Sequence, residues 1–162
     1  MDAAVFFALA LACAPQVHPD TARAIASVES GFNPYAIGVV GGRLERQPRT
    51  RAEALATIAA LRQAGWNYSV GIAQINVANF GRLGLTPRTA LDPCTSLTAL
   101  QSVLGECYAR ASSTGAAQIA LRQALSCYYS GNFTTGLRHG YVHKVVRASV
   151  AGSALSNRKE RL

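Results

Sequence analysis

The sequence predicts a single, mainly α-helical domain with at most a short β-hairpin. Its 162 residues are the length of one ordinary domain, and 49% of them are hydrophobic while 15% are charged, which is typical of a globular protein. Apolar residues recur with helical spacing between residues that begin or end helices. Because no repeat or linker divides the chain, we expect one domain over residues 1–155 and a basic flexible tail over residues 156–162.

The first predicted helix covers the apolar run AAVFFALALACA, residues 3–14. Asp2 can cap its N-terminus, and Pro15 ends it. The run also resembles the apolar part of a secretory signal peptide, but it lacks the positively charged start that such a peptide carries. It is too short to cross a bilayer, which takes about 20 residues. We therefore expect a helix of the folded domain, no transmembrane segment and no evident export signal.

Pro19 begins the second predicted helix, which Gly31 and Pro34 end. Glu29 lies in its last turn and is one of only 8 acids in the chain. The helix dipole and the apolar neighbours of Glu29 both disfavour a carboxylate there, so we expect its pKa to be raised. The alternative is an ordinary solvated acid at a helix end.

A Gly-rich stretch without helical period, residues 35–50, predicts a loop or a small hairpin. Thr50 and Glu53 then form the T-x-x-E pattern of a capping box, so a third helix follows, and Gly65 ends it. Further along, Asp92 and Pro93 begin a long helix with an apolar stripe. Two more helices are expected over about residues 116–128 and 141–150.

Residues 66–80, WNYSVGIAQINVANF, mix aromatic and amide side chains without a helical period. The amides Gln74, Asn76 and Asn79 suit the wall of a groove that binds a polar ligand. Ordinary loop capping by asparagine explains them equally well on composition alone.

The charge balance of 16 Lys and Arg against 8 acids, a formal charge of +8, indicates a polyanionic partner. The arginines are scattered singly and are not interleaved with aromatic residues, so we do not expect nucleic acid to be that partner. No P-loop, dinucleotide fingerprint, H-E-x-x-H or G-x-S-x-G is present, and the three histidines (His18, His139 and His143) are far apart in sequence except for the last two. We therefore expect no metal and no cofactor, which leaves acid–base chemistry by Glu29.

The four cysteines are far apart and include no C-x-x-C pair. Cys107 and Cys127 lie on successive predicted helices that a short Ser/Gly linker can fold into an antiparallel pair. Their pairing would leave Cys13 to pair with Cys94. Two disulfides in an oxidising compartment are therefore predicted, and four buried free thiols in a cytosolic protein are the alternative.

Three segments occur in an order and at spacings that resemble the motifs of lytic transglycosylases in the goose-type lysozyme superfamily: ESGFNPYAIG, GIAQIN and ALSCYYSGN. Three others resemble more narrowly the peptidoglycan-cleaving subunit of type IV secretion systems: ANFGRLGLTP, DPC and GYV. Three positions depart from the family pattern, with Gly38 where serine is common, Ala73 where methionine is common and Tyr129 where asparagine is common.

The resemblance implies a lysozyme-like (SLT-type) fold and a periplasmic enzyme that cleaves the MurNAc–GlcNAc bond of peptidoglycan, leaving 1,6-anhydroMurNAc ends and opening the wall for a secretion or conjugation apparatus. It implies that Glu29 is the catalytic acid and that the hydroxyl of Tyr128 reaches toward it. Ser30 would position the acid, cap the helix or bind substrate. The expected substrate-binding residues are Ser30, Gln74, Asn76, Tyr128 and Tyr129.

Two alternatives to this function stay open. One is a hydrolytic lysozyme-like muramidase, which needs a second carboxylate to hold a water, and Glu45 in the predicted loop is the only plausible second acid. The other is a catalytically weak, wall-binding module for secretion assembly. A basic surface suits every one of these functions, because the peptide stems of the wall carry carboxylates.

Overall fold

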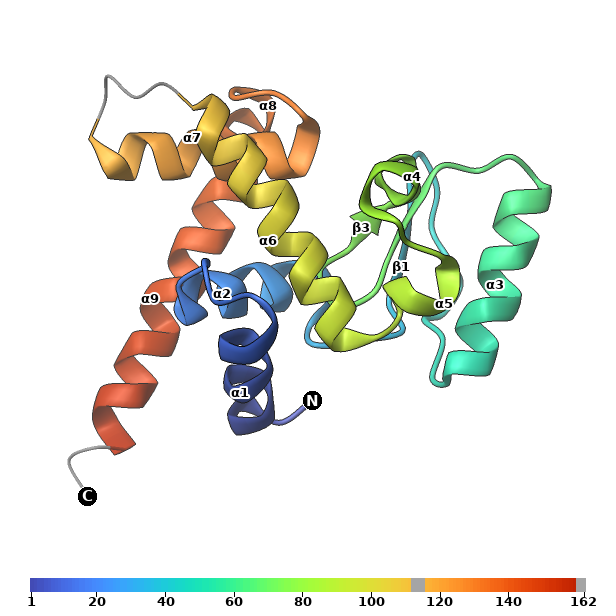
Figure 1. Cartoon of the computed structure of the whole chain (residues 1–162), viewed down its shortest axis with the longest axis horizontal. Coiled ribbons are helices and arrows are strands. Elements are labelled where there is room, and N and C mark those ends of the chain that lie inside the picture. The colour runs from blue at the N-terminus through green and yellow to red at the C-terminus, as the bar shows by residue number, and fades with distance from the viewer. Residues whose placement is uncertain (112–115, 160–162) are drawn as a thin grey trace.

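The structure, a computed structural model, describes residues 1–111 and 116–159, with residues 152–159 described as backbone only. Within these ranges the chain forms nine α-helices, one short 3-10 helix and a three-stranded sheet (Figure 1). The mainly α-helical fold class is therefore confirmed. The elements in chain order are α1 (Ala3–Cys13), α2 (Pro19–Ser30), β1 (Ile37–Val39), α3 (Arg51–Gln63), β2 (Tyr68–Val70), β3 (Ile75–Asn76), η1 (Val77–Asn79), α4 (Phe80–Leu83), α5 (Pro87–Ala90), α6 (Pro93–Arg110), α7 (Ala117–Ser130), α8 (Thr135–Arg138) and α9 (Tyr141–Lys159).

Helix α1 is a packed helix of the domain, as the sequence predicted. The side chain of Asp2 accepts a hydrogen bond from the backbone N–H of Ala4 at 2.7 Å and so caps the helix. Phe6 and Ala10 are completely buried, and the helix packs against α2 and α6. Among the described residues, no helix combines the length and the hydropathy that crossing a membrane requires.

Helix α2 lies at the centre of the helical packing, against α1 and α9. Three of its alanines are completely buried, and their small side chains let neighbouring helices approach closely: Ala22, Ala24 and Ala26. Gly31 ends the helix in the left-handed conformation at φ 57°, and its N–H donates to the carbonyl of Ser27. This ending places Glu29 in the last turn of the helix.

The sheet is antiparallel with strand order β1-β2-β3. Of the loop and the small hairpin that the sequence allowed for residues 35–50, no hairpin forms within this range, because β1 pairs with β2, which follows α3 in the chain, with Ile37 opposite Val70. The sequence gives no local signal for this pairing, which joins segments about thirty residues apart. Thr50 caps α3 as predicted, accepting from the N–H of Glu53.

The later helices run slightly longer than the sequence predicted. Helix α7 continues to Ser130, and α9 continues beyond residue 150 to Lys159. The linker at 112–115 lies outside the described residues. The proposed tail from residue 156 begins within α9, where no side chains are described, and residues 160–162 lie outside the described ranges, so a flexible tail stays a prediction.

Two disulfides join the helices in the pairs that the sequence predicted. Cys13 at the end of α1 is bonded to Cys94 at the start of α6. Cys107 near the end of α6 is bonded to Cys127 near the end of α7. Disulfides persist in oxidising compartments, so these bonds favour such a compartment for this protein.

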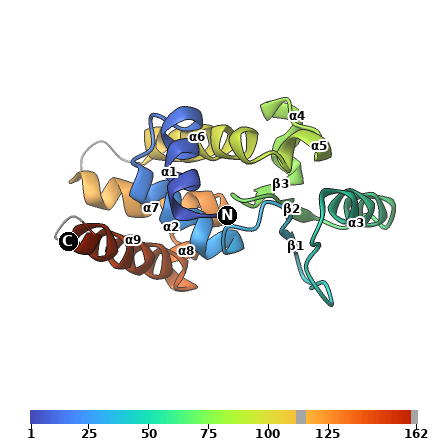
Figure 2. The ribbon, with the colours of Figure 1, turned by 90° about the horizontal axis from the view of Figure 1, so that it is seen from below.

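The elements gather into two lobes, which both views show (Figures 1 and 2). The larger lobe holds α1, α2 and α6 to α9. The smaller lobe holds the sheet with α3, α4 and α5, and the start of α6 lies beside it. Helices α6 and α7 form one of the most extensive contacts in the larger lobe.

Candidate active site

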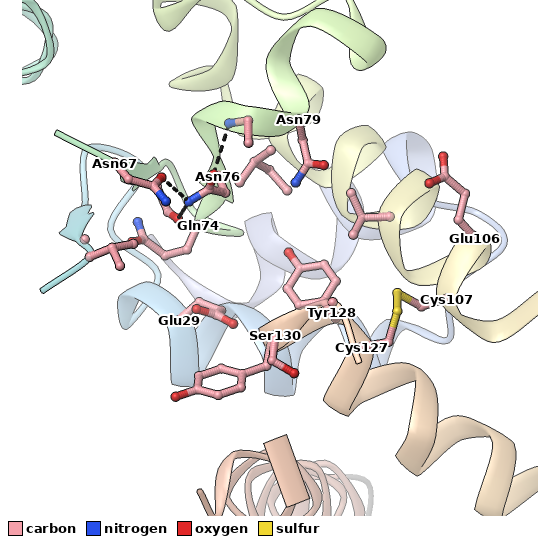
Figure 3. Close-up of a pocket in the computed structure, with 18 of the residues that line it drawn as sticks. Glu29, Asn67, Gln74, Asn76, Asn79, Glu106, Cys107, Cys127, Tyr128 and Ser130 are labelled. Carbon is pink, nitrogen blue, oxygen red and sulfur yellow. Dashed lines mark hydrogen bonds between the residues drawn. A yellow bond between two sulfur atoms is a disulfide. The ribbon is translucent and has the colours of Figure 1, made fainter. Parts of the chain in front are cut away.

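A cleft of about 750 Å³ lies between the two lobes. Its walls are formed by the edges of the sheet, the η1–α4 segment, and the facing surfaces of α6 and α7. Glu29 of α2 opens into it, with Gln74 above and Tyr128 beside it (Figure 3). The first and second sequence motifs therefore meet the third at one place.

Glu29 is a half-buried acid whose environment favours the protonated form. Burial in the cleft wall raises its pKa from 4.5 to about 7, while a hydrogen bond from Tyr141 opposes part of that rise. The rise agrees with the expectation from the sequence. A carboxyl group with a pKa near neutrality can both donate and accept a proton under physiological conditions.

Tyr141, the first residue of α9, holds the carboxyl group of Glu29. Its hydroxyl donates to Oε1 of Glu29 at 2.6 Å, across 112 positions of sequence. The tyrosine is buried, and burial together with the neighbouring carboxylate raises its own pKa well above the ordinary value. It therefore stays protonated and keeps donating. The GYV segment contains this residue, but its sequence alone predicted no role for Tyr141.

The turn GIAQ, residues 71–74, is fixed against three helices by hydrogen bonds to its backbone. Its two central carbonyl groups accept from Ser30 of α2 at 2.8 Å and from Tyr128 of α7 at 2.6 Å. The N–H of Ala73 donates to the buried hydroxyl of Ser96 of α6 at 3.3 Å. Few rearrangements are open to a turn that is tied at so many points.

Gln74 projects from this turn into the cleft in a fixed orientation. Its Nε2 donates to the carbonyl groups of Ala36 at 2.9 Å and Gly71 at 3.0 Å. Its backbone is left-handed at φ 50°, which is uncommon for a residue with a side chain. A Cβ atom at Gly38 would lie 2.7 Å from Oε1 of Gln74. The glycine found where serine is common thus leaves room for this carboxamide.

The hydroxyl of Tyr128 was expected to reach toward Glu29, and this expectation is corrected because the hydroxyl has another partner. Tyr128 lies close enough for the charge of Glu29 to raise its pKa, after the larger effect of burial. Its hydroxyl, however, donates to the carbonyl group of Ala73. The direction of α7 points the phenol at the turn, and Tyr141 from α9 takes the position on the carboxyl group.

The chain matches the family described as "Transglycosylase SLT domain" over residues 7–145. The chain belongs to this family. No solved structure gives a significant match.

Several curated relatives of this SLT-domain chain carry names from type IV secretion. It is 51% identical over 151 residues to the type IV secretion system protein virB1 of Brucella abortus, covering 89% of this chain and 63% of the relative. It is 43% identical over 139 residues to protein virB1 of Agrobacterium fabrum, covering 85% of this chain and 56% of the relative. The chain thus spans less than two thirds of the length of these relatives.

Ser30 does not line the cleft of this SLT domain. Besides its bond to the carbonyl group of Ile72, its hydroxyl donates to the carbonyl group of Ala26, 3.1 Å away in the same helix. The bond to Ile72 ties the end of α2 to the 71–74 turn, whereas the bond to Ala26 stays within the helix. This geometry supports the positioning role that the sequence analysis allowed and gives no support to substrate binding.

Asn76 lines the cleft, but protein groups occupy its amide. Its Oδ1 accepts from the N–H of Ala78 at 3.0 Å and caps η1. Its Nδ2 donates to Asn67 at 2.9 Å and to Ser69 at 3.2 Å (Figure 3). The capping role, one of the two that the sequence left open, is therefore confirmed. A contact of Asn76 with a ligand would be additional to it.

Tyr129 places a half-exposed aromatic ring on the cleft. The ring stacks on Tyr141 with centroids 4.6 Å apart and planes 21° apart. Its hydroxyl lies 3.3 Å from Nδ1 of His139. The tyrosine found where asparagine is common thus supports the residue that holds Glu29 and leaves part of its ring exposed at the cleft.

The muramidase alternative would need Glu45 as a second acid across the cleft from Glu29, and the structure does not place it there. Glu45 is an exposed residue of the loop after β1 and does not line the cleft. The cleft carboxylate that the structure reveals besides Glu29 is Glu106 of α6, which accepts from Arg82 at 2.6 Å. One sequence signal could have indicated Glu106: it directly precedes Cys107, whose predicted disulfide turns this part of α6 toward α7.

Proposed function

We propose that this chain is a lytic transglycosylase that cleaves the β-1,4 bond between MurNAc and GlcNAc in peptidoglycan without water. The observation that carries the proposal is the carboxyl group of Glu29, which opens into a cleft between lobes, has a pKa of about 7 and is held by a tyrosine that stays protonated. Membership of the SLT family supports the same reaction.

In the first step Glu29 gives its proton to the glycosidic oxygen while the bond from that oxygen to C1 of the muramoyl residue breaks. The carbonyl oxygen of the residue's own acetamido group bonds to C1 and shares the positive charge. In the second step the Glu29 carboxylate removes the proton of the C6 hydroxyl, and O6 bonds to C1 in place of the acetamido oxygen. The acid is then protonated again, and no water is consumed.

This route needs one carboxylate, whereas hydrolysis by the usual pair of carboxylates needs two. Glu45 does not line the cleft, and Glu106 lines it but is held in an ion pair by Arg82. Neither is therefore available as a free base opposite Glu29. These positions favour the non-hydrolytic reaction over the muramidase alternative.

Mass spectrometry of muropeptides released from purified peptidoglycan tests the proposal. Glu29→Gln keeps the size and the hydrogen bond to Tyr141 but cannot transfer the proton, so release should fall by about 10²- to 10⁴-fold. Glu45→Gln should keep most activity and is the matched control. The main product should be an anhydro end, lighter by one water than a reducing end. Reducing ends would indicate a muramidase, and undiminished release by Glu29→Gln would exclude Glu29 as the acid.

We further infer that the protein works in the periplasm and opens the wall for a type IV secretion or conjugation apparatus. The two disulfides support an oxidising compartment, and the names of the virB1 relatives support the secretion context. In a strain that lacks the protein, the wild-type chain should restore secretion and Glu29→Gln should not. Restoration by both would favour an assembly role without catalysis.

A further inference from the structure

The end of the cleft formed by α6 carries charges that the proposed chemistry does not use. Val103, Glu106, Cys107 and Arg110 lie on one face of α6, at the three- and four-residue spacing of a helical stripe, and all line the cleft. Glu106 and Cys107 lie across the cleft from Glu29, with Tyr128 between them (Figure 3).

Arg82 closes this end from the side of α4. Its Nη1 donates to both carboxylate oxygens of Glu106, at 2.6 Å and 2.7 Å, and its Nε donates to Asn79 at 3.0 Å. These bonds fix the guanidinium group in place. They also occupy Glu106, which stands four residues before Arg110 and would otherwise be placed to pair with it.

Arg110 is thereby left as a cation on the cleft. Among the described residues, no carboxylate lies within ion-pair distance of it. Its guanidinium carbon lies 5.7 Å from the centroid of the Phe133 ring, and within the described part of the chain its Nη2 makes one long contact, 3.5 Å, with the carbonyl oxygen of Gly131. The ring and the helix thus orient a guanidinium group whose other N–H groups can bind a ligand.

We propose that Arg110 binds a carboxylate of the lactyl group of a muramoyl residue or of the peptide stem joined to it, which makes this end of the cleft selective for glycan strands that carry such an acidic substituent. The inference rests on the proposed function. The sugar rings of such a strand offer only neutral hydroxyl and acetamido groups, so a cation gains most from the acidic substituent. Arginine presents a planar fork of donors that matches a carboxylate.

Binding measurements in the Glu29→Gln background, where strands are not consumed, test this by calorimetry. Three probes are compared: strands with intact peptide stems, strands stripped by an amidase, which keep only the lactyl carboxylate, and neutral chito-oligosaccharides. Arg110→Ala should raise the Kd for peptide-bearing strands about tenfold, the loss of one charge-assisted contact, and leave the Kd for chito-oligosaccharides within about twofold. Arg110→Lys should raise the Kd for these strands less than Arg110→Ala does. Added salt should shrink the difference in Kd between the wild-type residue and Arg110→Ala.

Arg122→Ala is the matched control, because Arg122 is an exposed arginine of α7 that does not line the cleft. It should change no Kd. If Arg110→Ala weakens stripped strands as much as peptide-bearing ones, the lactyl carboxylate is the ligand, and if only peptide-bearing strands weaken, the stem is. Equal weakening of the neutral probe, or no weakening at all, would overturn the proposal. Failure of the Glu29→Gln parent to bind any strand would count against the proposed function instead.

Discussion

Glu29 is costly to the fold as well as central to the proposed chemistry. Its folded-state pKa, about 7, is above the ordinary value of 4.5, so the folded chain holds this proton more tightly than the unfolded chain does. The stability of the wild-type fold should therefore fall as the pH rises from about 4.5 through about 7. Below that window both states are protonated, and the penalty disappears.

Glu29→Gln should consequently stabilise the fold at about pH 8 by up to about 3 kcal/mol and make little difference at about pH 4. The glutamine is neutral at both values and can still accept from Tyr141. Urea unfolding of the two proteins at each pH measures the difference. An advantage of the variant that is equal at both values would mean that burial of the charge is not its source.

The alkaline limb of the pH profile should report the bond between Tyr141 and Glu29. That hydrogen bond lowers the pKa of Glu29, so Tyr141→Phe should raise it and move the loss of kcat/KM at high pH to higher pH. The rate at the optimum should fall, because the carboxyl group loses its orientation. Tyr129→Phe is the control, since that hydroxyl faces His139, and its limb should stay in place. An alkaline limb that moves to lower pH in Tyr141→Phe would contradict the inference that this hydrogen bond lowers the pKa of Glu29.

Among the structural elements, the 71–74 turn does most to assemble the site. It gathers hydrogen bonds from α2, α6 and α7 and presents Gln74 to the cleft. Its first residue must be glycine for two reasons: φ is 82°, and a Cβ atom would lie 2.5 Å from the carbonyl oxygen of Ala90.

Gly71→Ala should therefore cost about 2 to 4 kcal/mol of stability, from backbone strain and a clash with backbone that cannot move away cheaply. Gly105→Ala offers a matched control within α6, where a Cβ atom would meet no neighbour within 4 Å, and it should gain about 0.5 to 1 kcal/mol. Chemical denaturation compares the two. Equal effects of both substitutions would contradict the close approach at Gly71.

For the whole molecule, the two disulfides have different places relative to the cleft. Cys13–Cys94 ties α1 to the start of α6, whereas Cys107–Cys127 joins α6 to α7 and both of its cysteines line the cleft. The first bridge spans 81 residues and the second 20. Chain entropy therefore makes the first the more stabilising, at about 4.5 kcal/mol against about 3 kcal/mol.

Replacing both cysteines of a bridge by alanine should separate stability from activity. The Cys13→Ala/Cys94→Ala pair should lose more stability but keep its kcat/KM at low temperature, because neither cysteine lines the cleft. The Cys107→Ala/Cys127→Ala pair should lose less stability and more activity, since the wall of the cleft is loosened. Thermal unfolding and release of muropeptides measure the two effects. Equal activity losses would show that the second bridge does not shape the site.

The features that the sequence determined by itself depend on near neighbours along the chain. Asp2 and Thr50 cap helices whose first turns lie next to them, and Gly31 ends α2 with Glu29 in its last turn. Caps and helical periodicity act over about four residues, so they can be read from the letters alone. Pairing of the cysteines followed from the same helices and their order.

The features that only the tertiary structure decided depend on contacts between distant segments. Tyr141, and not Tyr128, reaches Glu29 across 112 positions, and Glu106, and not Glu45, enters the cleft. Strand β1 likewise finds β2 beyond α3. Which polar group meets which is set by the directions of packed helices, because each buried donor must find an acceptor within about 3 Å. The sequence thus determined the acid and its helix, and the packing of α7, α9 and the 71–74 turn around it decided which groups hold it.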